Sequence, residues 1–218
     1  MRTYVSTIGF DSTRVTRPIL TNGLERDDRI VLLQPHGQND TSRADEAVTD
    51  IERLVKELQP NTTVEQVEIR YDEFHTAIGQ CSSIISDSQD EVVVILGGGA
   101  RDIYLPLAIA AFVHKHDIKK VLQFSDIDGS VTELVFPNLT VLLSDKQFTI
   151  LSCLADSNAD LSLSELSEET GIAKSTVTRH VSELEDFGFL TTEYHGRRKH
   201  TCVTDEGVLY QEMNWSDN

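Results

Sequence analysis

A glycine-rich turn between a predicted strand and a predicted helix is the first candidate for binding chemistry. The run from Glu91 to Leu96 is β-branched and apolar, which is typical of a buried parallel strand, and Ile103 to Val113 favours a helix. The turn between them holds Gly97, Gly98, Gly99, Ala100, Arg101 and Asp102. Glycines let the backbone approach a ligand, the first N–H groups of a helix are unpaired, and arginine is a forked phosphate donor. The turn therefore predicts an anion site, although it matches neither Gly-x-Gly-x-x-Gly nor a Walker motif, and a plain tight turn is the alternative.

A second polar turn follows the first predicted strand of the chain. Arg2 to Ile8 alternates and then turns apolar, which favours a strand. The residues after it are Gly9, Phe10, Asp11, Ser12, Thr13 and Arg14. Because Asp, Ser and Thr cap helices, a helix is predicted to begin here and to run to Leu20, with Asn22 and Gly23 ending it and Pro18 suggesting a kink or an early stop. The alternative is that these polar residues are caps and nothing more.

A third polar turn follows the predicted strand from Arg29 to Gln34. It runs from Pro35 to Arg43 and consists mainly of polar residues. We predict that His36 and Arg43 contact a ligand from this turn. For His36 the alternative is a solvated loop residue.

The N-terminal half alternates predicted strands and helices, which indicates an α/β fold. The other elements are a helix with an apolar stripe from Ala44 to Leu58, a strand from Thr63 to Ile69, a helix from Phe74 to Ile85 and a strand from Lys120 to Phe124. Elements of this length predict a Rossmann-like, mainly parallel, doubly wound sheet. Asp128-Gly129 is a hairpin signal, so we expect the sheet to finish in an antiparallel hairpin.

The three polar turns are expected at one edge of this sheet. In doubly wound sheets, ligands bind beyond the carboxyl ends of the strands, near the point where the winding reverses. The chain lacks the glycine fingerprint and the ribose-binding acidic residue of a dinucleotide-binding dehydrogenase. It also has no nucleophile elbow, catalytic triad motif or metal-ligand set, so we predict no catalytic residue, no metal site and no cofactor apart from an effector.

The pattern changes to short helices at Ser144. A ligand-sensing domain is expected over residues 1–137, a linker over 138–143 and a second domain over 144–218. Helices are predicted from Ser144 through Leu154, from Ser162 or Ser164 to a break at Gly171, and from Ile172 to Gly188. The last of these has an inner stripe of Val177, Val181 and Leu184, while its polar residues Lys174, Ser175, Thr176, Thr178, Arg179 and Ser182 lie mostly off that stripe. Such a helix-turn-helix is typical of proteins that place a helix in the major groove of DNA.

A basic hairpin is predicted after the third helix. Phe189 to Tyr194 and Thr201 to Val203 are predicted as strands joined by a tip from His195 to His200, with a closing helix from Thr204 to Met213. Arg197, Arg198 and Lys199 provide three of the six basic residues in a segment of net charge -8. This local reversal of charge favours contact with a polyanion over a solvated face. The predicted DNA contacts are Ser164, Lys174, Ser175, Thr176, Thr178, Arg179, Arg197, Arg198, Lys199 and His200.

The net charge of -17 would ordinarily argue against a nucleic-acid partner, because phosphates repel an acidic surface. The charge is spread evenly, with -9 over residues 1–143 and -8 over residues 144–218, which favours general adaptation to a salt-rich cytoplasm. The chain has no apolar run near 18 residues and no N-terminal hydrophobic region, so we expect a soluble, cytoplasmic protein without a membrane partner. Cys81, Cys153 and Cys202 form no CxxC pair, and buried thiols are expected.

The C-terminal segment resembles the winged helix-turn-helix domains of archaeal transcription regulators. The similarity lies in Ser164 to Leu166, Gly171 to Val177 and Leu184 to Leu190. Together with Thr7 to Arg14 and Gly97 to Asp102, the whole chain resembles the CRISPR-associated regulators that join a CARF domain to a winged helix. The resemblance implies a homodimer whose paired CARF domains bind a cyclic oligoadenylate, usually the tetramer, across the two-fold axis. It assigns Gly9 to Arg14 and Gly97 to Asp102 to the ligand, whereas relatives need not be as acidic as this chain.

The expected function is a ligand-modulated transcription regulator of CRISPR-associated genes that binds double-stranded promoter DNA and is not an enzyme. One alternative is a winged-helix regulator that senses another small anion. A second alternative is a CARF ring nuclease, in which Ser12, Thr13 and Arg101 would support attack of a ribose 2′-OH on the adjacent phosphate.

Overall fold

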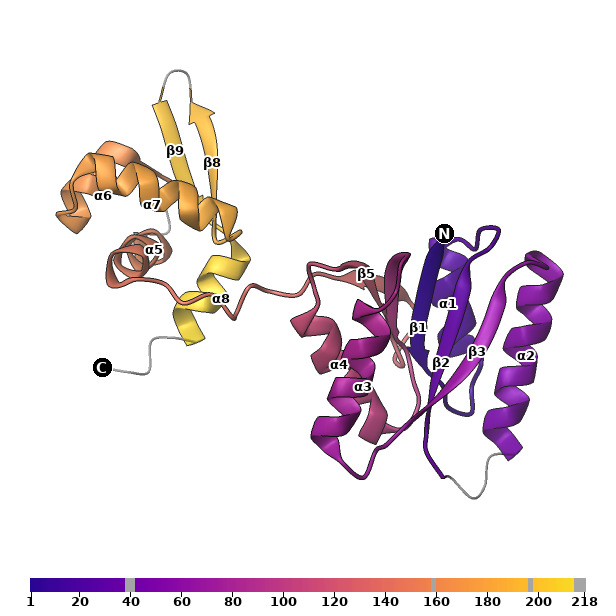
Figure 1. The fold of residues 1–218 in the computed structure, drawn as a ribbon. Helices are drawn as coiled ribbons and strands as arrows, with labels where there is room; N and C mark the ends of the chain where they lie inside the picture. Colours follow the sequence, from indigo (N-terminus) through magenta and orange to yellow (C-terminus); the bar gives the residue numbers. More distant parts are fainter. Residues whose placement is uncertain (38–41, 158–159, 196–197, 214–218) are drawn as a thin grey trace. The chain divides into compact units, whose positions relative to one another are not determined.

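The computed structural model describes residues 1–37, 42–157, 160–195 and 198–213 of the chain. It contains two compact units, Met1–Phe136 and Pro137–Asn218, each with a core of its own (Figure 1). The predicted α/β fold followed by a small winged helix-turn-helix fold is confirmed.

The first unit is a six-stranded sheet in the order β3-β2-β1-β4-β5-β6, parallel except for the edge strand β6. Its strands are β1 Arg2–Thr7, β2 Arg29–Pro35, β3 Thr63–Ile69, β4 Glu91–Leu96, β5 Ile118–Phe124 and β6 Val131–Leu134. Its helices are α1 Thr13–Asn22, α2 Ser42–Leu58, α3 Phe74–Ser86 and α4 Arg101–Val113. The strand order runs outward from β1 in one direction and from β4 in the other, so the winding reverses between these two strands.

Two apolar layers, one on each face of the sheet, explain why its central strands are continuous hydrophobic runs. Val92 and Val94 pack in the layer that also contains the buried residues of α3 and α4, whereas Val93 and Ile95 pack in the layer of α1 and α2 (Figure 1). Successive side chains of a strand point to opposite faces, so a strand that is covered on both faces needs apolar residues at every position.

The described part of the second unit packs four helices and a small sheet around one core. Its elements are α5 Asp145–Ser157, β7 Leu161–Ser162, α6 Leu163–Thr170, α7 Lys174–Asp186, β8 Leu190–His195, β9 Arg198–Val203 and α8 Asp205–Met213. The sheet is antiparallel in the order β7-β9-β8. Phe189 and Tyr210 lie at the centre, with ring centroids 4.6 Å apart. The Tyr210 hydroxyl donates to the Val141 carbonyl at 2.7 Å, and Val141 and Leu143 pack on this core, although a linker is predicted there from the sequence.

Several predicted boundaries are wrong by a few residues. Helix α7 begins at Lys174 instead of Ile172, because Ala173 has an extended ψ of 135° and takes the N-cap position. Strand β9 begins at Arg198, so Arg198, Lys199 and His200 belong to a strand and not to a tip. Strand β7 is absent from the prediction because two residues are too short to show alternation. Of the three cysteines expected to be buried, only Cys81 is buried, while Cys153 and Cys202 are partly exposed.

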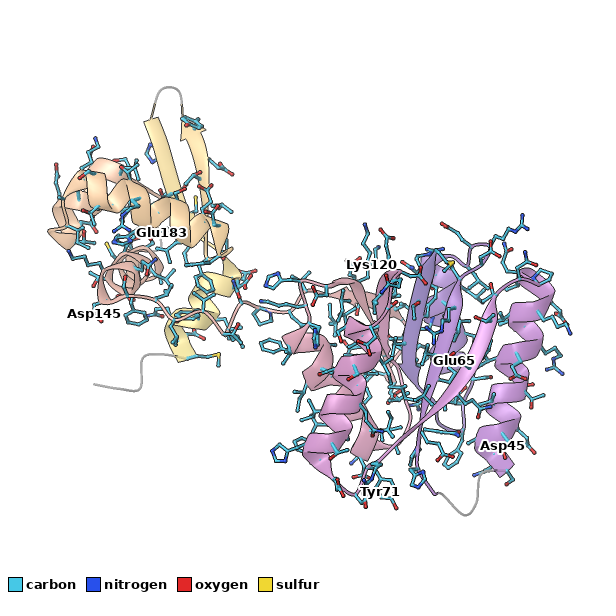
Figure 2. The ribbon with its side chains drawn as sticks, viewed as in Figure 1. Asp45, Glu65, Tyr71, Lys120, Asp145 and Glu183 are labelled. Atoms are coloured by element: carbon cyan, nitrogen blue, oxygen red, sulfur yellow. The ribbon has the colours of Figure 1, made fainter. Side chains whose placement is uncertain are left out.

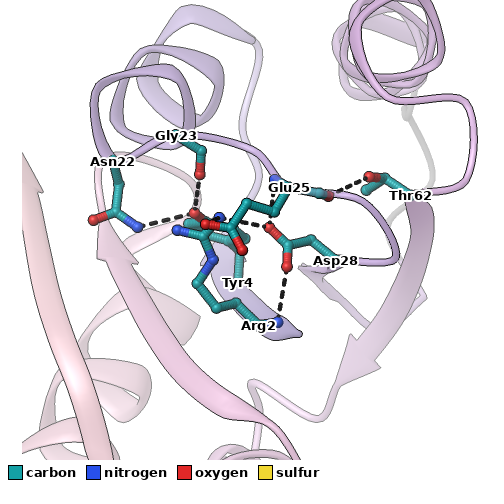
Figure 3. Close-up of polar contacts among 7 residues, drawn as sticks. All are labelled: Arg2, Tyr4, Asn22, Gly23, Glu25, Asp28 and Thr62. Atoms are coloured by element: carbon teal, nitrogen blue, oxygen red, sulfur yellow. Dashed lines mark hydrogen bonds and ion pairs between the residues drawn. The ribbon is translucent and has the colours of Figure 1, made fainter.

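A buried carboxylate ties the first strand to the loop before the second (Figure 3). Asp28 is fully buried and accepts hydrogen bonds from the Arg2 backbone at 2.8 Å, the Arg2 guanidinium at 3.0 Å and the Glu25 backbone at 2.8 Å. The Tyr4 hydroxyl donates to the Gly23 carbonyl at 2.6 Å and accepts from Asn22, and burial raises the pKa of Tyr4. These bonds fix the connection between α1 and β2 on the edge opposite the polar turns.

Replacement of Asp28 tests the importance of this network. Asp28→Ala leaves the Arg2 guanidinium without its buried partner, and we expect it to lower the free energy of unfolding of the first unit by about 2–4 kcal/mol. Glu25→Ala is the matched control: this side chain is 70% exposed and pairs with the same guanidinium, so we expect a loss below about 1 kcal/mol. Urea unfolding followed by hydrogen exchange of the β1 and β2 peptides measures both. Equal losses of unfolding free energy in the two variants would contradict the structural role given to the buried Asp28 carboxylate.

Candidate ligand pocket and nucleic-acid interface

Two glycine turns meet where the winding of the sheet reverses. The turn after β1 and the turn after β4 are in backbone contact, since a Cβ built on Gly9 would lie 3.1 Å from the Gly99 nitrogen. Gly99 has a φ of +95°, which favours glycine, and its own Cβ would lie 2.7 Å from the Thr7 side chain. The Thr7 hydroxyl donates to the Gly98 carbonyl. Strand ends and turns are therefore joined at this edge, which is where doubly wound sheets bind ligands.

Helix α1 packs against the turn after β4 through Arg14. The Arg14 carbonyl lacks the usual helical donor because residue 18 is a proline, and a Cβ on Gly97 would clash with the Arg14 carbonyl oxygen. The stem of Arg14 lies against Gly98. Pro18 sits inside α1, which continues to Asn22, so of the two predicted effects, a kink or an early stop, the early stop does not occur. Its missing N–H coincides with a close contact between α1 and the turn after β4.

The Arg14 guanidinium connects three segments of the first unit. It lies 2.8 Å from Asp126, on the loop between β5 and β6, and 3.6 Å from Asp11. Partial burial acts to raise the pKa of Asp11, but hydrogen bonds from Thr13 and the nearby Arg14 charge outweigh it, so the pKa lies below its ordinary value. Because two carboxylates already bind Arg14, its main effect in this structure is to position the turns.

A cavity of about 310 Å³ lies at this edge. Of the residues predicted to bind ligand, Gly9, Phe10, Asp11, Arg14, Gly99 and Ala100 line it. Ile8, Pro35 and Ala44 complete the wall and are missing from the prediction. Ile8 and Pro35 stand at strand ends and Ala44 in the first turn of α2. They lie in or beside the predicted turns, but a search for polar residues passes over them because they are apolar.

A second cavity of about 470 Å³ shares Phe10 and Asp11 with the first. Ser12 and Arg43 line it as predicted ligand residues, and Glu46, Ala47 and Asp50 of α2 are additional. Residues 43, 46, 47 and 50 occupy one face of a helix, so helical spacing could have identified them.

The other predicted ligand residues lie outside both cavities. His36 is 64% exposed and contacts Glu68 of β3, which fits the solvated alternative. Gly97 and Gly98 pack on Arg14, and the Thr13 amide donates to Asp11 at 2.9 Å. Arg101 and Asp102 are exposed in the first turn of α4.

The electrostatics of this edge are mixed. Ser12, at the start of α1, and Ala100, at the start of α4, provide no side-chain cap, but Asp11 already accepts from the Thr13 amide of α1. The start of α4 therefore offers more open backbone N–H groups, with partial positive charge, to an anion than the start of α1 does. Within the described part of the chain, Arg43 and Arg101 form no ion pair, whereas Arg29, Arg53 and Arg70 do. Carboxylates of Asp11, Glu46, Asp50 and Asp126 lie nearby, so any anion must contact the donors directly.

The helix-turn-helix in the second unit presents a polar surface. Ser162 and Glu165 form a capping box that starts α6, and Gly171 ends it in the left-handed conformation at φ 68°. The Lys174 ammonium donates to the Ser164 hydroxyl at 2.7 Å, which joins α7 to α6. The predicted DNA contacts Ser164, Lys174, Ser175, Thr178 and Arg179 are exposed, and Thr176 is half-buried.

The predicted basic hairpin is only partly described. Arg197 lies outside the described residues, as do the side chains of Arg198 and Lys199. The backbone of Arg198 to His200 forms the start of β9, where His200 pairs with Glu193 of β8 and Ser162 of β7. His200 is half-buried in this strand.

Glu183 joins the exposed helix to the rest of its unit (Figure 2). Its carboxylate accepts from Gln147 of α5 at 2.9 Å and binds the buried His180 at 2.9 Å and Arg179 at 3.0 Å. The hydrogen bond with His180 is the main reason that the pKa of Glu183 is lowered, and partial desolvation opposes it. Helical spacing could have predicted the contacts of Glu183 with Arg179 and His180, whereas Gln147 is 36 residues away and no local pattern indicates it.

The described residues contain no group of three or more side chains suited to a metal ion, and no helix among them is long and apolar enough to cross a membrane.

The fold, the crevice at the switch point and the helix-turn-helix define a two-domain DNA-binding regulator. Residues 2–132 match the model of the Csa3 CRISPR-associated Rossmann-like domain, and residues 145–193 match the IclR helix-turn-helix domain. Since the first match spans more than half of the chain, the chain belongs to the Csa3 family of CRISPR-associated regulators.

Three solved structures each cover about a third of this chain. MepR, a transcription regulator of the Staphylococcus aureus multidrug efflux pump MepA, is 19% identical over 33% of this chain and 54% of its own, with a TM-score of 0.31. The PcaV transcriptional regulator from Streptomyces coelicolor is 27% identical over 32% of this chain and 51% of its own, with a TM-score of 0.31. AF1382 from Archaeoglobus fulgidus is 19% identical over 34% of this chain and 86% of its own, with a TM-score of 0.31. The matched segment therefore spans about half of MepR and PcaV, and no curated protein matches the chain.

A single methyl group should disturb the contact between α1 and the turn after β4. Gly97→Ala places a Cβ against the Arg14 carbonyl, and we expect it to destabilise the first unit by about 1–3 kcal/mol through overpacking. Gly79→Ala is the control, because a Cβ meets nothing within 4 Å there and alanine favours the α3 helix by about 0.5–1 kcal/mol. Opposite shifts in the thermal midpoint of the first unit are expected. A neutral Gly97→Ala would show that the turns are not in close contact.

The Glu183 cluster predicts a pH dependence for the second unit. Because the folded pKa of Glu183 is lowered from 4.5, its stabilisation is complete above that value and is lost as the pH falls through the lowered pKa. Glu183→Gln lacks this titration, so the stability difference between wild type and variant should shrink between pH 5.5 and pH 3. Urea unfolding of the second unit at both pH values measures it. A difference that stays constant would contradict the role of the ionised carboxylate.

Proposed function

We propose that the first unit senses a cyclic oligoadenylate, specifically the tetramer, and that occupancy changes the affinity of the helix-turn-helix for promoter DNA. The observation that carries the proposal is the backbone contact between the turns after β1 and β4 at the switch point of the sheet. Membership of the Csa3 family supports the same assignment.

Phosphates fit the donors at this edge. The N-termini of α1 and α4 lie there, and backbone amides at helix starts bind phosphate. Asp11 accepts from the Thr13 amide of α1, whereas Ala100 leaves the first amides of α4 without a side-chain cap. Arg101 stands in the first turn of α4 without an ion pair to any described residue, so its guanidinium can take a phosphate oxygen. A symmetric ring of four nucleotides would engage the crevices of two protomers across a two-fold axis, which is why the proposal includes a homodimer.

DNA would be bound by the exposed face of α7. Lys174, Ser175 and Arg179 are exposed there, at the end and on the face that enter a major groove in helix-turn-helix proteins. A dimer would read two half-sites roughly 34–36 Å apart. At molar salt the Debye length is about 3 Å, so close hydrogen bonds must carry more of the recognition than long-range attraction. Ligand can regulate binding only if its affinity differs between two arrangements of the dimer.

Labelled cyclic tetraadenylate tests the sensor directly. We expect wild type to bind it without turnover and Arg101→Ala to bind roughly 10-fold or more weakly, because a charge-assisted hydrogen bond is lost. Arg26→Ala is the control, since Arg26 is 77% exposed beside Asp27 on the opposite edge of the sheet. Calorimetry and chromatography of the ligand separate the outcomes. Linear products would favour the ring-nuclease alternative, and absence of binding would leave a sensor of another anion.

Salt-dependent DNA binding tests the second unit. Lys174→Ala should weaken promoter binding and reduce the salt slope, log affinity against log salt, by about 1, as expected for one lost phosphate contact. Lys146→Ala on α5 is the control in the same unit. Fluorescence anisotropy at several salt concentrations measures both. If Lys174→Ala matches the control in affinity and slope, α7 is not the DNA-binding helix.

A further inference from the structure

Phe10 is the shared wall of the two cavities. It lines both, and its side chain is 62% exposed, although a phenylalanine ring is usually buried. Its ring therefore offers a flat apolar surface at the ligand edge that the fold of the unit does not use.

Arg43 already covers one face of this ring. Its guanidinium carbon lies 5.9 Å from the ring centroid, and it forms no ion pair with any described residue, although Glu46 and Asp50 lie on the same face of α2. An exposed cation–π contact is weak, whereas stacking of a nucleobase on an aromatic ring is stronger. A base between ring and guanidinium needs two contacts of about 3.5 Å each. A separation of about 7 Å is reached when the exposed Arg43 side chain moves outward by roughly 1 Å.

The Glu46 carboxylate can accept a hydrogen bond from the edge of such a base. Asp50 is paired with Arg53 at 2.7 Å, but Glu46 has neither an ion pair nor a hydrogen bond to the described residues. A carboxylate accepts hydrogen bonds from an amino group and repels a carbonyl oxygen. Adenine carries an amino donor at position 6, where hypoxanthine carries an oxygen.

We propose that Phe10 and Arg43 stack on the two faces of one purine base and that Glu46 selects adenine through its 6-amino group. This inference rests on the proposed function and names the residues that determine its base specificity. It also accounts for the Glu46 carboxylate in the second cavity, because this carboxylate contacts the edge of a base and not a phosphate.

Matched ligands and variants separate stacking from edge recognition. The ligands are cyclic tetraadenylate, AMP and IMP, and the variants are Phe10→Leu, Arg43→Gln and Glu46→Gln. Phe74→Leu and Lys56→Gln are controls, since both are exposed on the same unit and line neither cavity. Calorimetry measures the affinity for cyclic tetraadenylate, and ligand-observed NMR measures the affinity for AMP and IMP. Thermal unfolding confirms that each variant is folded.

Phe10→Leu should weaken the binding of cyclic tetraadenylate, AMP and IMP alike, by roughly 5- to 150-fold. Arg43→Gln should act in the same direction. Glu46→Gln should strengthen the binding of IMP, because the repulsion of its 6-oxygen is removed, and should reduce the preference for AMP over IMP. If Phe10→Leu binds every ligand as tightly as Phe74→Leu, or if Glu46→Gln keeps the full preference for AMP, the proposal is overturned.

The outcomes also separate this proposal from the proposed function. Tight binding of the ring to both wild type and Phe10→Leu overturns the stacking site and leaves the sensor intact. Phe10-dependent binding of AMP without binding of the ring supports the stacking site and overturns the sensor. Failure of wild type to bind either ligand overturns both.

Discussion

The contact between two glycine turns is the constraint on which the first unit depends. Gly9 and Gly99 approach so closely that a Cβ on Gly9 would lie 3.1 Å from the other backbone, and Gly97 has no room for a Cβ beside the Arg14 carbonyl. This approach brings the N-termini of α1 and α4 to one edge. Pro18 contributes by removing the helical donor to Arg14, so a residue that looks like a helix breaker belongs to the packing of the turn.

The acidity of the chain is reconciled with anionic partners by local pairing. A net charge of -17 repels phosphate at long range, but several carboxylates at the ligand edge already hold a partner, as Asp11 and Asp126 hold Arg14 and Asp50 holds Arg53. Arg43 and Arg101, which form no ion pair with the described residues, stand at the same edge. Recognition is therefore expected to depend on short contacts, which salt screens less than it screens long-range attraction.

Local patterns predicted most of the fold and only part of the site. Alternation and helical stripes located the elements because they are properties of neighbouring residues, and the glycines at 97–99 identified a turn. The meeting of Ile8, Pro35 and Ala44 around one cavity, the pairing of His36 with Glu68 and the bond from Gln147 to Glu183 depend on which strands and helices become neighbours. Such contacts link residues far apart in the chain, and no local pattern encodes them.

Linkage between the two units is the central claim, and one pair of titrations tests it most directly. The first titration measures the affinity of the full chain for DNA upstream of neighbouring CRISPR-associated genes, with and without saturating cyclic tetraadenylate. The second measures the affinity for cyclic tetraadenylate with and without that DNA, at the same salt concentration. Thermodynamic linkage requires the same factor in both directions, and we predict roughly 5- to 150-fold. Binding of both partners with no change in either affinity would contradict the account.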